Sequence, residues 1–339
     1  MSEADQNRTN TGRQQLHFEN APTLDLSIII VSWNAKAYLQ KCLKSIAQVP
    51  GVPAMEIIVV DNASADGSPE MVEKEFPAVR VIRSGGNLGF AKGNNLGMRA
   101  SRGRFLGLIN SDVEVLDDCF RRLLDRMEQH ARLGMAGPLV FGGDGNIQRS
   151  CHGFPGVWNM FCRALALDHL FPGNQWFNGY QLLHSAQNTE QPVDILSGCF
   201  WLVRREAVEQ VGGLDEDFFM YAEDMDWCRR FHAAGWENRL IPAARAIHYG
   251  GGSSANAPVR FFVEKQRADL QYWAKHQSRP AMACFFLIVC LHLLVRMAGY
   301  TLALLVKKTE RSDYQHKVKR SLACLKWMFT RRAPAPKAS

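Results

Sequence analysis

The stretch Phe105-Leu106-Gly107-Leu108-Ile109-Asn110-Ser111-Asp112 is an apolar run that ends in a carboxylate. A run this short and this apolar is typical of a strand buried on both faces of a sheet. Asp112 is then expected at the carboxyl edge of the sheet, where open α/β sheets bind ligands. An acid after a strand also forms ordinary turns and helix caps, so a functional role depends on the residues that accompany it.

Strand-like and helix-like segments alternate around this run. The pattern predicts strands at 26–31, 56–60, 79–82 and 195–203, and helices at 37–48, 69–75, 94–100 and 205–211. Strands that alternate with helices form right-handed βαβ units around a parallel sheet, so the fold class is α/β. Between 141 and 193 the chain is rich in Gly, Asn, Trp and Phe without clear periodicity. We expect loops and short elements there that shape a substrate cleft.

The composition is that of a globular protein of one large domain or two small ones, with 339 residues, 47% of them hydrophobic and 22% charged. Residues 1–24 are polar and lack the apolar segment of a signal peptide, so we expect a disordered lead-in. The expected division is 1–24, a catalytic domain at 25–278, membrane-associated helices at 279–332, and a tail at 333–339. Nine cysteines without a CxxC pair argue against a disulfide framework or zinc site, and favour a reducing cytosol.

The net charge of +7 is concentrated at the end of the chain. From residue 307 onward ten Lys or Arg accompany only two acids, so the remaining 306 residues carry a charge of about −1. The basic character therefore belongs to a tail, and the sequence does not indicate a nucleic-acid-binding face.

An apolar stretch at 281–306 is long enough for a membrane span of ~20 residues. His292 and Arg296 lie in its middle, and a single crossing would place the basic tail outside, against the positive-inside rule. We therefore expect a re-entrant or in-plane segment with both flanks cytosolic. An apolar stripe then follows at Val318, Leu322, Leu325 and Phe329, as in an interfacial helix. A soluble helical hairpin or a partner-binding helix is the alternative.

Two loops that follow predicted strands carry groups suited to a nucleotide. Asp61 and Asn62 come directly after a strand, and could pair with the ring N–H and carbonyl of a pyrimidine, although an ordinary Asx turn gives the same pattern. The segment 85–95 combines glycines, amides and Lys92 ahead of a helix, where backbone N–H groups favour phosphate. A plain turn is the default interpretation of this second loop.

Acidic groups suggest metal binding and proton transfer. Asp112 could hold Mg²⁺ or Mn²⁺, which commonly bridge a protein carboxylate and a substrate diphosphate. Residues 218–227 place three acids within four residues among aromatic side chains. A solvated helix start gives the same acidity. The aromatic neighbours make a partly buried acid with a raised pKa plausible, as a general base requires.

The sequence resembles family 2 glycosyltransferases of GT-A fold, and within them the rhamnosyltransferase-like branch. The resemblance covers about residues 26–255 and rests on six motifs in the same order: SIIIVSWN (27–34), VVDNASADGS (59–68), NLGFAKGNN (87–95), NSD (110–112), GCFWLVRREAVEQVGGLDEDFFMYAEDMDW (198–227) and HYGGGSS (248–254). It implies a Rossmann-like, mixed and mostly parallel sheet flanked by helices, here followed by the C-terminal membrane-associated helices.

The resemblance also implies roles for single residues. Asp61 and Asn62 would lie against the nucleotide base, although many relatives have two adjacent acids there. Asp112 would be the metal ligand of a DxD-like motif of which only the last acid is present. His248 would lie near the metal and diphosphate, or else cap a loop. With one acid the cation should bind weakly until the donor's diphosphate shares it.

The remaining implied roles concern the base and the donor. Asp224 is the implied catalytic base, and Glu223 is the alternative. The other implied donor-binding residues are Ser32, Asn34, Asn87, Gly89, Lys92, Asn94 and Ser111.

The expected reaction is inverting transfer of a sugar from a nucleotide diphosphate sugar to an acceptor hydroxyl. The resemblance suggests L-rhamnose from dTDP-rhamnose, and a lipid-linked or cell-surface polysaccharide precursor as acceptor. We expect Mg²⁺ or Mn²⁺ as cofactor, no nucleic-acid partner, and a peripheral or monotopic location on the cytoplasmic face of the inner (plasma) membrane.

Two other function classes remain open. A nucleotidyltransferase of sugar phosphates would share the sheet and metal, but no Gly-rich triphosphate loop with a signature Arg and Lys follows the first strand. A catalytically silent membrane-bound binding protein would not need Asp112, Asp224 and His248 together.

Overall fold

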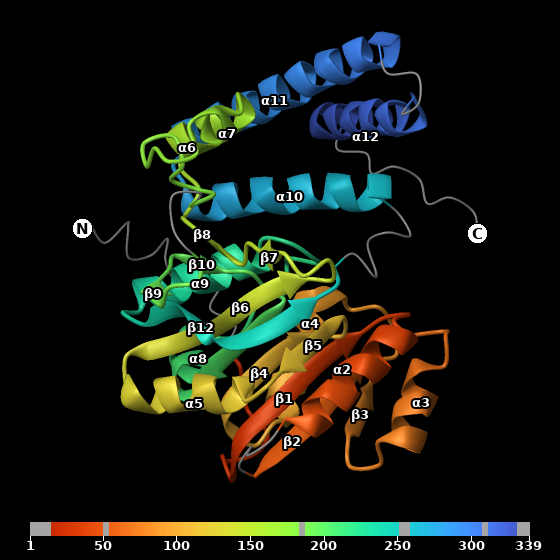
Figure 1. The fold of residues 1–339 in the computed structure, drawn as a ribbon, viewed down its shortest axis with the longest axis vertical. Helices are drawn as coiled ribbons and strands as arrows, with labels where there is room; N and C mark the ends of the chain where they lie inside the picture. The colour runs from red at the N-terminus through yellow and green to blue at the C-terminus, as the bar shows by residue number, and fades with distance from the viewer. Residues whose placement is uncertain (1–14, 50–53, 183–186, 251–257, 307–310, 331–339) are drawn as a thin grey trace. The chain divides into compact units, whose positions relative to one another are not determined.

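The run quoted first forms β4 (Gly103–Asn110), an inner strand of a ten-stranded sheet in the computed structural model (Figure 1). The structure describes residues 15–49, 54–182, 187–250, 258–306 and 311–330. Five consecutive residues of β4, from 105 to 109, are buried, as the apolar run predicts. Ser111 and Asp112 form the turn that follows the strand.

The sheet is mixed, and its main path runs β3-β2-β1-β4-β11-β6-β12-β5. Strands β1, β2, β3, β4, β6 and β12 share one direction, since parallel pairs join β3 to β2 to β1 to β4, and antiparallel β11 links β4 to β6. The bounds are β1 Leu24–Ser32, β2 Met55–Asp61, β3 Arg80–Arg83, β5 Val113–Leu116, β6 Leu133–Gly142, β11 Phe200–Arg204 and β12 Glu237–His248. Short strands β7 (Ile147–Gln148) and β9 (Gln191–Pro192) pair with β6 and β12.

Helices cover both faces of this sheet. On one face α2 (Lys36–Gln48), α3 (Ser68–Glu75) and α5 (Cys119–Gln129) share a core with β1, β2 and β4. On the other face α4 (Gly89–Ala100) packs closely on the sheet, because Gly97 has no side chain. A Cβ at this position would lie only 2.4 Å from a side-chain carbon of Ile29. Two further helices, α8 (Arg205–Val211) and α9 (Glu223–Ala233), follow β11. The predicted α/β class is confirmed.

Two predicted elements differ from those observed. Helix α4 begins at Gly89 rather than Asn94, so the end of the glycine-rich loop is the first turn of the helix. The predicted strand 195–203 is two strands, because Ser197 donates its N–H to the Ser150 carbonyl at 2.7 Å. β10 (Ile195–Leu196) therefore pairs with β8 (Cys151–His152) outside the main sheet, and β11 enters the sheet antiparallel.

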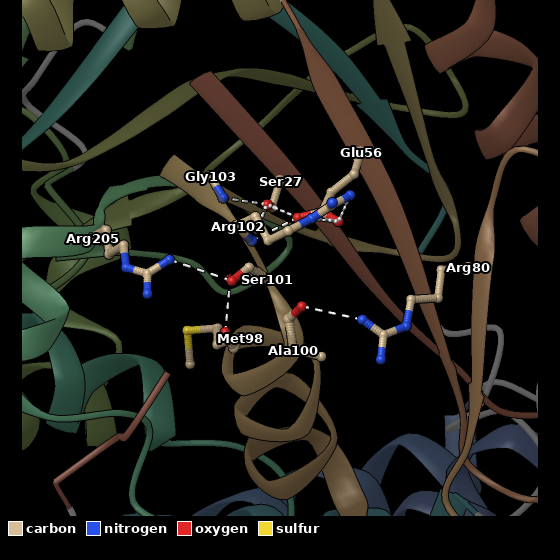
Figure 2. Close-up of polar contacts among 9 residues, drawn as sticks. All are labelled: Ser27, Glu56, Arg80, Met98, Ala100, Ser101, Arg102, Gly103 and Arg205. Carbon is tan, nitrogen blue, oxygen red and sulfur yellow. Dashed lines mark hydrogen bonds and ion pairs between the residues drawn. The ribbon is translucent and has the colours of Figure 1, made fainter. Parts of the chain in front are cut away.

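At the amino ends of β2 and β4, which we call the amino edge, polar groups pair with one another (Figure 2). Glu56 accepts hydrogen bonds from the Ser27 hydroxyl and the Arg102 backbone N–H, both at 2.6 Å. The Gly103 N–H donates to Ser27 Oγ at 2.7 Å. Two more arginine contacts, each of 3.3 Å, are Arg80 to the Ala100 carbonyl and Arg205 to the Ser101 carbonyl.

The chain divides into two compact units. The sheet unit comprises Met1–Phe154 and Ser185–Ser253, and the helical unit comprises Pro155–His184 and Ser254–Ser339. The helical unit contains α6 (Val157–Ala164), α7 (Leu167–Leu170), α10 (Pro258–His276), α11 (Arg279–Val306) and α12 (Arg311–Thr330). The predicted boundaries at 24, 278 and 332 stay predictions. Most of the lead-in and the whole tail lie outside the described residues.

Helix α11 is exposed on one side up to Leu293, and none of its described residues from 294 to 305 is buried. Among the described residues it is the helix long and apolar enough to cross a membrane, judged by length and composition. Its exposed side carries Leu287, Leu291, Leu294, Leu302 and Leu305, at spacings that keep them on one helical face. Its buried side chains, Phe285, Ile288, Val289 and Leu293, lie on the opposite face.

Candidate functional site

The carboxyl ends of the co-directional strands form one edge of the sheet, here called the carboxyl edge. β1 ends at Ser32, β2 at Asp61 and β12 at His248, and Asp112 follows β4 by two residues. Ser32 is aligned with Asp61, and His248 with Val113, so these positions are close across the sheet. Three motifs that the sequence separates are thus brought to one edge.

Ser32, Asp61 and Asn62 form a buried polar group at this edge. The Asp61 carboxylate accepts the Ser64 N–H at 3.2 Å, which is the Asx turn considered as its alternative role. Asn62 donates from Nδ2 to the Gly89 carbonyl at 3.1 Å. Ser32 Oγ and Asn62 Oδ1 are buried and have no hydrogen-bond partner among the described residues. Because unpaired buried polar atoms are costly, these two atoms are candidates for binding a ligand.

Asn34 connects two loops at this edge. Its side-chain oxygen accepts the Ala65 N–H at 2.8 Å, and its own backbone N–H donates to Ser64 Oγ at 3.0 Å. Its backbone has a φ of 48°, in the left-handed region that asparagine tolerates. Asn34 is therefore held in a supporting contact between the loops that follow β1 and β2.

The glycine-rich loop meets the segment that precedes the acidic cluster. Gly89 has a φ of 81°, and a Cβ there would lie 2.4 Å from the Phe219 carbonyl oxygen. That same oxygen accepts the Phe90 N–H at 2.9 Å. Asn87 accepts the Gly89 N–H at 3.0 Å. Only glycine fits position 89, and its fit brings the start of α4 against the chain that leads into α9.

Lys92 and Asn94 differ in their exposure. Lys92 is exposed on the first turn of α4, whereas Asn94 is buried and donates to the Phe90 carbonyl at 3.0 Å. Asn95, which sequence reasoning did not single out, is a packing residue. It donates to the Leu214 carbonyl at 2.8 Å and accepts the Leu214 N–H at 2.9 Å.

Asp112 and His248 meet directly. His248 Nε2 lies 3.3 Å from Asp112 Oδ1, and the two side chains are 14% and 12% exposed. The Tyr249 N–H donates to the Asp112 carbonyl at 3.0 Å, which ties the two strand ends together. Ser111, the residue before Asp112, is buried in the turn.

Gln148, on β7, contacts the other ring nitrogen of His248. Its Oε1 lies 3.1 Å from Nδ1. In this orientation of the amide, Oε1 can accept a hydrogen from Nδ1. An outer partner on the second ring nitrogen is usual for metal-binding histidines. No sequence motif marks Gln148, so sequence reasoning missed it.

The donor set fits a divalent cation that another molecule helps to hold. Among the described residues no group of three or more His, Cys, Asp or Glu side chains is placed to hold a metal ion. The carboxylate oxygen of Asp112 and the imidazole nitrogen of His248, 3.3 Å apart, would supply two ligands. Mg²⁺ and Mn²⁺ take six, and commonly complete their shell with substrate phosphate and water.

The three acids of α9 occupy different environments. Asp226 is fully buried and forms an ion pair with Arg230 at 2.8 Å. We therefore interpret Asp226 as a residue that stabilises the fold. Glu223 is buried, and its Oε2 has no partner among the described residues. Burial, and then the charge of Asp224, raise the pKa of Glu223 well above its ordinary value. Asp224 is half-buried and accepts the Met225 N–H at 2.8 Å.

The backbone before these acids is strained. Tyr221 and Ala222 have φ angles of 71° and 63°, which non-glycine residues rarely adopt. Such conformations cost of order 1–3 kcal/mol each and cluster at functional sites. The turn sets the direction in which α9 begins, and so the position of Glu223 and Asp224.

The thiol of Cys199 relates the acidic cluster to the metal pair. Burial is the largest cause that raises its pKa to about 12, and the negative charges of Asp112 and Asp224 also raise it. Both carboxylates therefore act on the same buried thiol just before β11.

The family of this chain follows from a comparison of its sequence with models of known families. The sequence model described as glycosyl transferase family 2 matches residues 27–212, which is more than half of the chain. This chain belongs to glycosyl transferase family 2. The predicted family is thus confirmed, and the matched range contains Asp61, the glycine-rich loop and Asp112.

The glycosyltransferase is similar in sequence to two rhamnosyltransferases. It is 29% identical over 265 residues to N-acetylglucosaminyl-diphospho-decaprenol L-rhamnosyltransferase of Mycobacterium tuberculosis, with 75% of this chain and 85% of that protein covered. It is 25% identical over 257 residues to the rhamnosyltransferase WbbL of Escherichia coli K12, with 73% and 92% covered. The predicted resemblance to rhamnosyltransferases is confirmed as a similarity in sequence.

Two solved structures share the fold. The mannosyltransferase PcManGT from Pyrobaculum calidifontis, in complex with GDP-Man and Mn²⁺, aligns with a TM-score of 0.53 at 16% identity, covering 95% of this chain and 93% of that one. GalNAc-T7 with UDP, GalNAc and Mn²⁺ aligns with a TM-score of 0.51 at 14% identity, covering 91% and 57%. These neighbours confirm the GT-A type fold. Membership of glycosyl transferase family 2 makes the chain a glycosyltransferase.

Proposed function

We propose that this glycosyltransferase moves L-rhamnose from dTDP-rhamnose to a hydroxyl of a lipid-linked saccharide, with inversion at the anomeric carbon. The similarity to two rhamnosyltransferases supports the sugar, and the decaprenol-linked substrate in the name of one of them supports the acceptor class. The observation that carries the site is the contact between Asp112 and His248 at the carboxyl edge. The packing of Gly89 against Phe219, in the segment that leads into α9, supports a place for the acids of α9 beside it.

The nucleotide lies between the ends of β1 and β2 and the start of α4. Ser32 Oγ and Asn62 Oδ1 would hydrogen-bond the base, since both are buried without a partner among the described residues. The exposed Lys92, on the first turn of α4, would face the diphosphate. The other residues assigned to donor binding, several of them through the loops that they hold, are Asn34, Asp61, Asn87, Gly89, Asn94 and Ser111.

Asp112 and His248 would hold Mg²⁺ or Mn²⁺ together with the donor's diphosphate. When bound, the cation offsets the negative charge that develops on the leaving diphosphate. A hydrogen bond from Nδ1 of His248 to Gln148 Oε1 would orient the imidazole so that Nε2 can act as a ligand. Two protein ligands account for a cation that binds firmly only with the donor present.

Asp224 is the catalytic base. As the acceptor oxygen attacks the anomeric carbon from the face opposite the diphosphate, Asp224 takes the hydroxyl proton, and the electrons of the breaking C–O bond leave with the diphosphate. Asp224 is half-exposed, whereas Glu223 is buried, and burial raises the pKa of Glu223 in the direction that favours its protonated form. This difference favours Asp224 over Glu223 as the base.

The site works at the cytoplasmic face of the inner membrane, where α11 and α12 lie in the plane of the bilayer interface. The exposed leucine face of α11 supports this location, and so do the exposed Leu322 and Phe329 of the predicted α12 stripe. An in-plane α11 keeps its opposite face in protein, which matches the burial of Phe285 and Leu293.

The test is hydrolysis and transfer with a panel of nucleotide sugars. Purified protein should release nucleoside diphosphate slowly from dTDP-rhamnose, faster with a polyprenyl-diphosphate-linked saccharide, and not after EDTA treatment. Release of pyrophosphate from a nucleoside triphosphate and sugar phosphate would instead indicate a nucleotidyltransferase. Donor binding without turnover under any of these conditions would indicate a binding protein, and would contradict the proposal.

A further inference from the structure

A cluster of exposed aromatic side chains lies in the helical unit, on residues that the sequence places in the middle of the chain. Trp158, Phe171 and Trp176 are 48%, 50% and 73% exposed, and Leu170 beside them is 67% exposed. We define these four residues, with Phe177, as the aromatic patch. The proposed glycosyl transfer makes no use of them.

The rings of the patch touch one another. Phe177 lies 5.2 Å from Phe171 and 6.4 Å from Trp158, and Trp158 lies 6.5 Å from Trp176, all between ring centroids. The patch is therefore one contiguous surface rather than scattered exposed side chains. A contiguous exposed apolar patch usually marks a protein or membrane interaction site.

The loop that carries the patch is held in place. Asn178 is fully buried, and its Nδ2 donates to the carbonyls of Asp168 and Phe171 at 2.9 Å. Trp158 Nε1 donates to the Trp176 carbonyl at 2.9 Å. Because these bonds fix the loop, the rings remain exposed instead of folding onto the protein.

Helix α6, which carries Trp158, packs on α11 (Figure 1). His292 Nδ1 of α11 lies 3.3 Å from the Ala164 carbonyl at the end of α6. Ala164 and His292 are 128 residues apart in the chain. The aromatic patch thus belongs to the same compact unit as the exposed leucine face of α11.

The charge of this unit is complementary to anionic lipid. Its described residues carry twelve Lys or Arg and four Asp or Glu, a net charge of +8. Basic residues near a bilayer surface attract anionic headgroups by about 1 kcal/mol each. Trp is enriched at the membrane–water interface, and Trp, Phe and Leu form the buried face of interfacial segments.

We propose that the aromatic patch inserts into the headgroup–acyl boundary of an anionic lipid bilayer, as a second anchor beside α11. The proposal rests on the membrane location proposed above for α11 and α12, and adds a surface from the middle of the chain. With contacts from both α11 and the patch, the helical unit is fixed in rotation on the bilayer as well as attached to it.

The first test is flotation of the full chain with phosphatidylcholine vesicles, with and without phosphatidylglycerol. The double variant Phe171→Ser/Trp176→Ser should lose about tenfold or more in partition to the anionic vesicles, because it removes two large apolar side chains from the interface. The matched variant Phe171→Leu/Trp176→Phe keeps an apolar surface and should float nearly as the wild type. Equal flotation of the serine variant and the wild type would overturn the proposal.

A second measurement reports insertion directly, even if α11 dominates the affinity. Vesicles with bromine near the headgroup end of the acyl chains should quench tryptophan fluorescence less in Trp176→Phe than in the wild type. Equal quenching in the two proteins, or a change from dimer to monomer in the serine variant without vesicles, would overturn the proposal. The second result would assign the patch to contact between copies of the chain.

Activity in detergent separates this proposal from the proposed function. The serine variant should hydrolyse dTDP-rhamnose at the wild-type rate, since the patch contains no proposed site residue. If neither protein turns over any donor and the flotation difference persists, the transferase assignment fails and the membrane surface stands.

Discussion

The two edges of the main sheet differ in whether their polar side chains find hydrogen-bond partners. At the amino edge, Ser27, Glu56 and Ser101 pair with neighbouring protein groups, and the network joins β1, β2 and β4 to the end of α4 (Figure 2). At the carboxyl edge, Ser32 Oγ and Asn62 Oδ1 are buried without a partner among the described residues. The same strands therefore end in a satisfied network on one side and an unsatisfied one on the other.

We interpret this difference as one between polar groups that stabilise the fold and polar groups that the proposed nucleotide would pair with. A paired buried group contributes about 0.5–1.5 kcal/mol to folding, whereas an unpaired one costs about 1–3 kcal/mol. Substitutions at the amino edge should thus reduce stability and spare donor binding. Substitutions at the carboxyl edge should do the reverse.

The largest expected effect is on the base. Asp224→Asn should lower sugar transfer by about 10²–10⁴-fold, because the amide cannot accept the acceptor's proton. Donor affinity by calorimetry and the thermal midpoint should both stay near the wild-type values. If Asp224→Asn retains transfer and Glu223→Gln abolishes it, Glu223 is the base and our assignment is wrong.

The next effect is on stability at the amino edge. Glu56→Ala removes the acceptor of the Ser27 hydroxyl and the Arg102 N–H, and should lower the free energy of unfolding by about 1–3 kcal/mol. The urea midpoint measures this change. Glu56→Gln keeps the acceptor oxygen and should lose less. A loss of donor affinity in Glu56→Ala, measured well below the unfolding transition, would contradict the division between the edges.

A pH-dependent effect is expected at Glu223. Folding raises its pKa, so between the ordinary value of about 4.3 and the raised one the folded state binds a proton that the unfolded chain has released. Wild-type stability therefore falls as pH rises through this range. Glu223→Gln has no proton to lose, so its urea midpoint should rise relative to that of the wild type as the pH increases above about 4.3. A difference that does not change with pH would contradict a raised pKa.

The smallest effects are expected from two matched serines. Ser32→Ala removes an unpaired hydroxyl and should leave stability unchanged or slightly higher, while donor affinity falls about threefold to tenfold. Ser101→Ala removes a hydroxyl that donates to the Met98 carbonyl at 2.7 Å, and should lower stability while donor affinity stays constant. The opposite pattern in the two variants would break the comparison.

Much of the fold could be predicted from local sequence. The strands before residue 112 and most of the helices follow from apolar runs and periodicity, and β4 with Asp112 behind it is the clearest case. The antiparallel entry of β11 could not be predicted, because the side chains of a short apolar run do not encode the direction of pairing. The early start of α4 was also missed, since Gly89 is a poor helix former whose position depends on the distant Phe219.

The candidate site was predicted in part. Asp112 and His248 were named from separate motifs, and their contact depends on the pairing of β5 with β12. Gln148 was missed because a glutamine on a two-residue strand carries no signal. The sequence also did not predict that residues 155–184 form one compact unit with the C-terminal helices. This grouping depends on contacts between residues far apart in the chain, such as Ala164 and His292.

The most direct test of the carboxyl edge as the donor site is calorimetric titration of dTDP, with Mn²⁺ or with EDTA, into wild type, Asp112→Ala and Glu56→Gln. We predict binding to the wild type and Glu56→Gln that requires Mn²⁺, and loss of that metal-dependent binding in Asp112→Ala. Binding to Asp112→Ala that equals the wild type, with and without EDTA, would contradict the account.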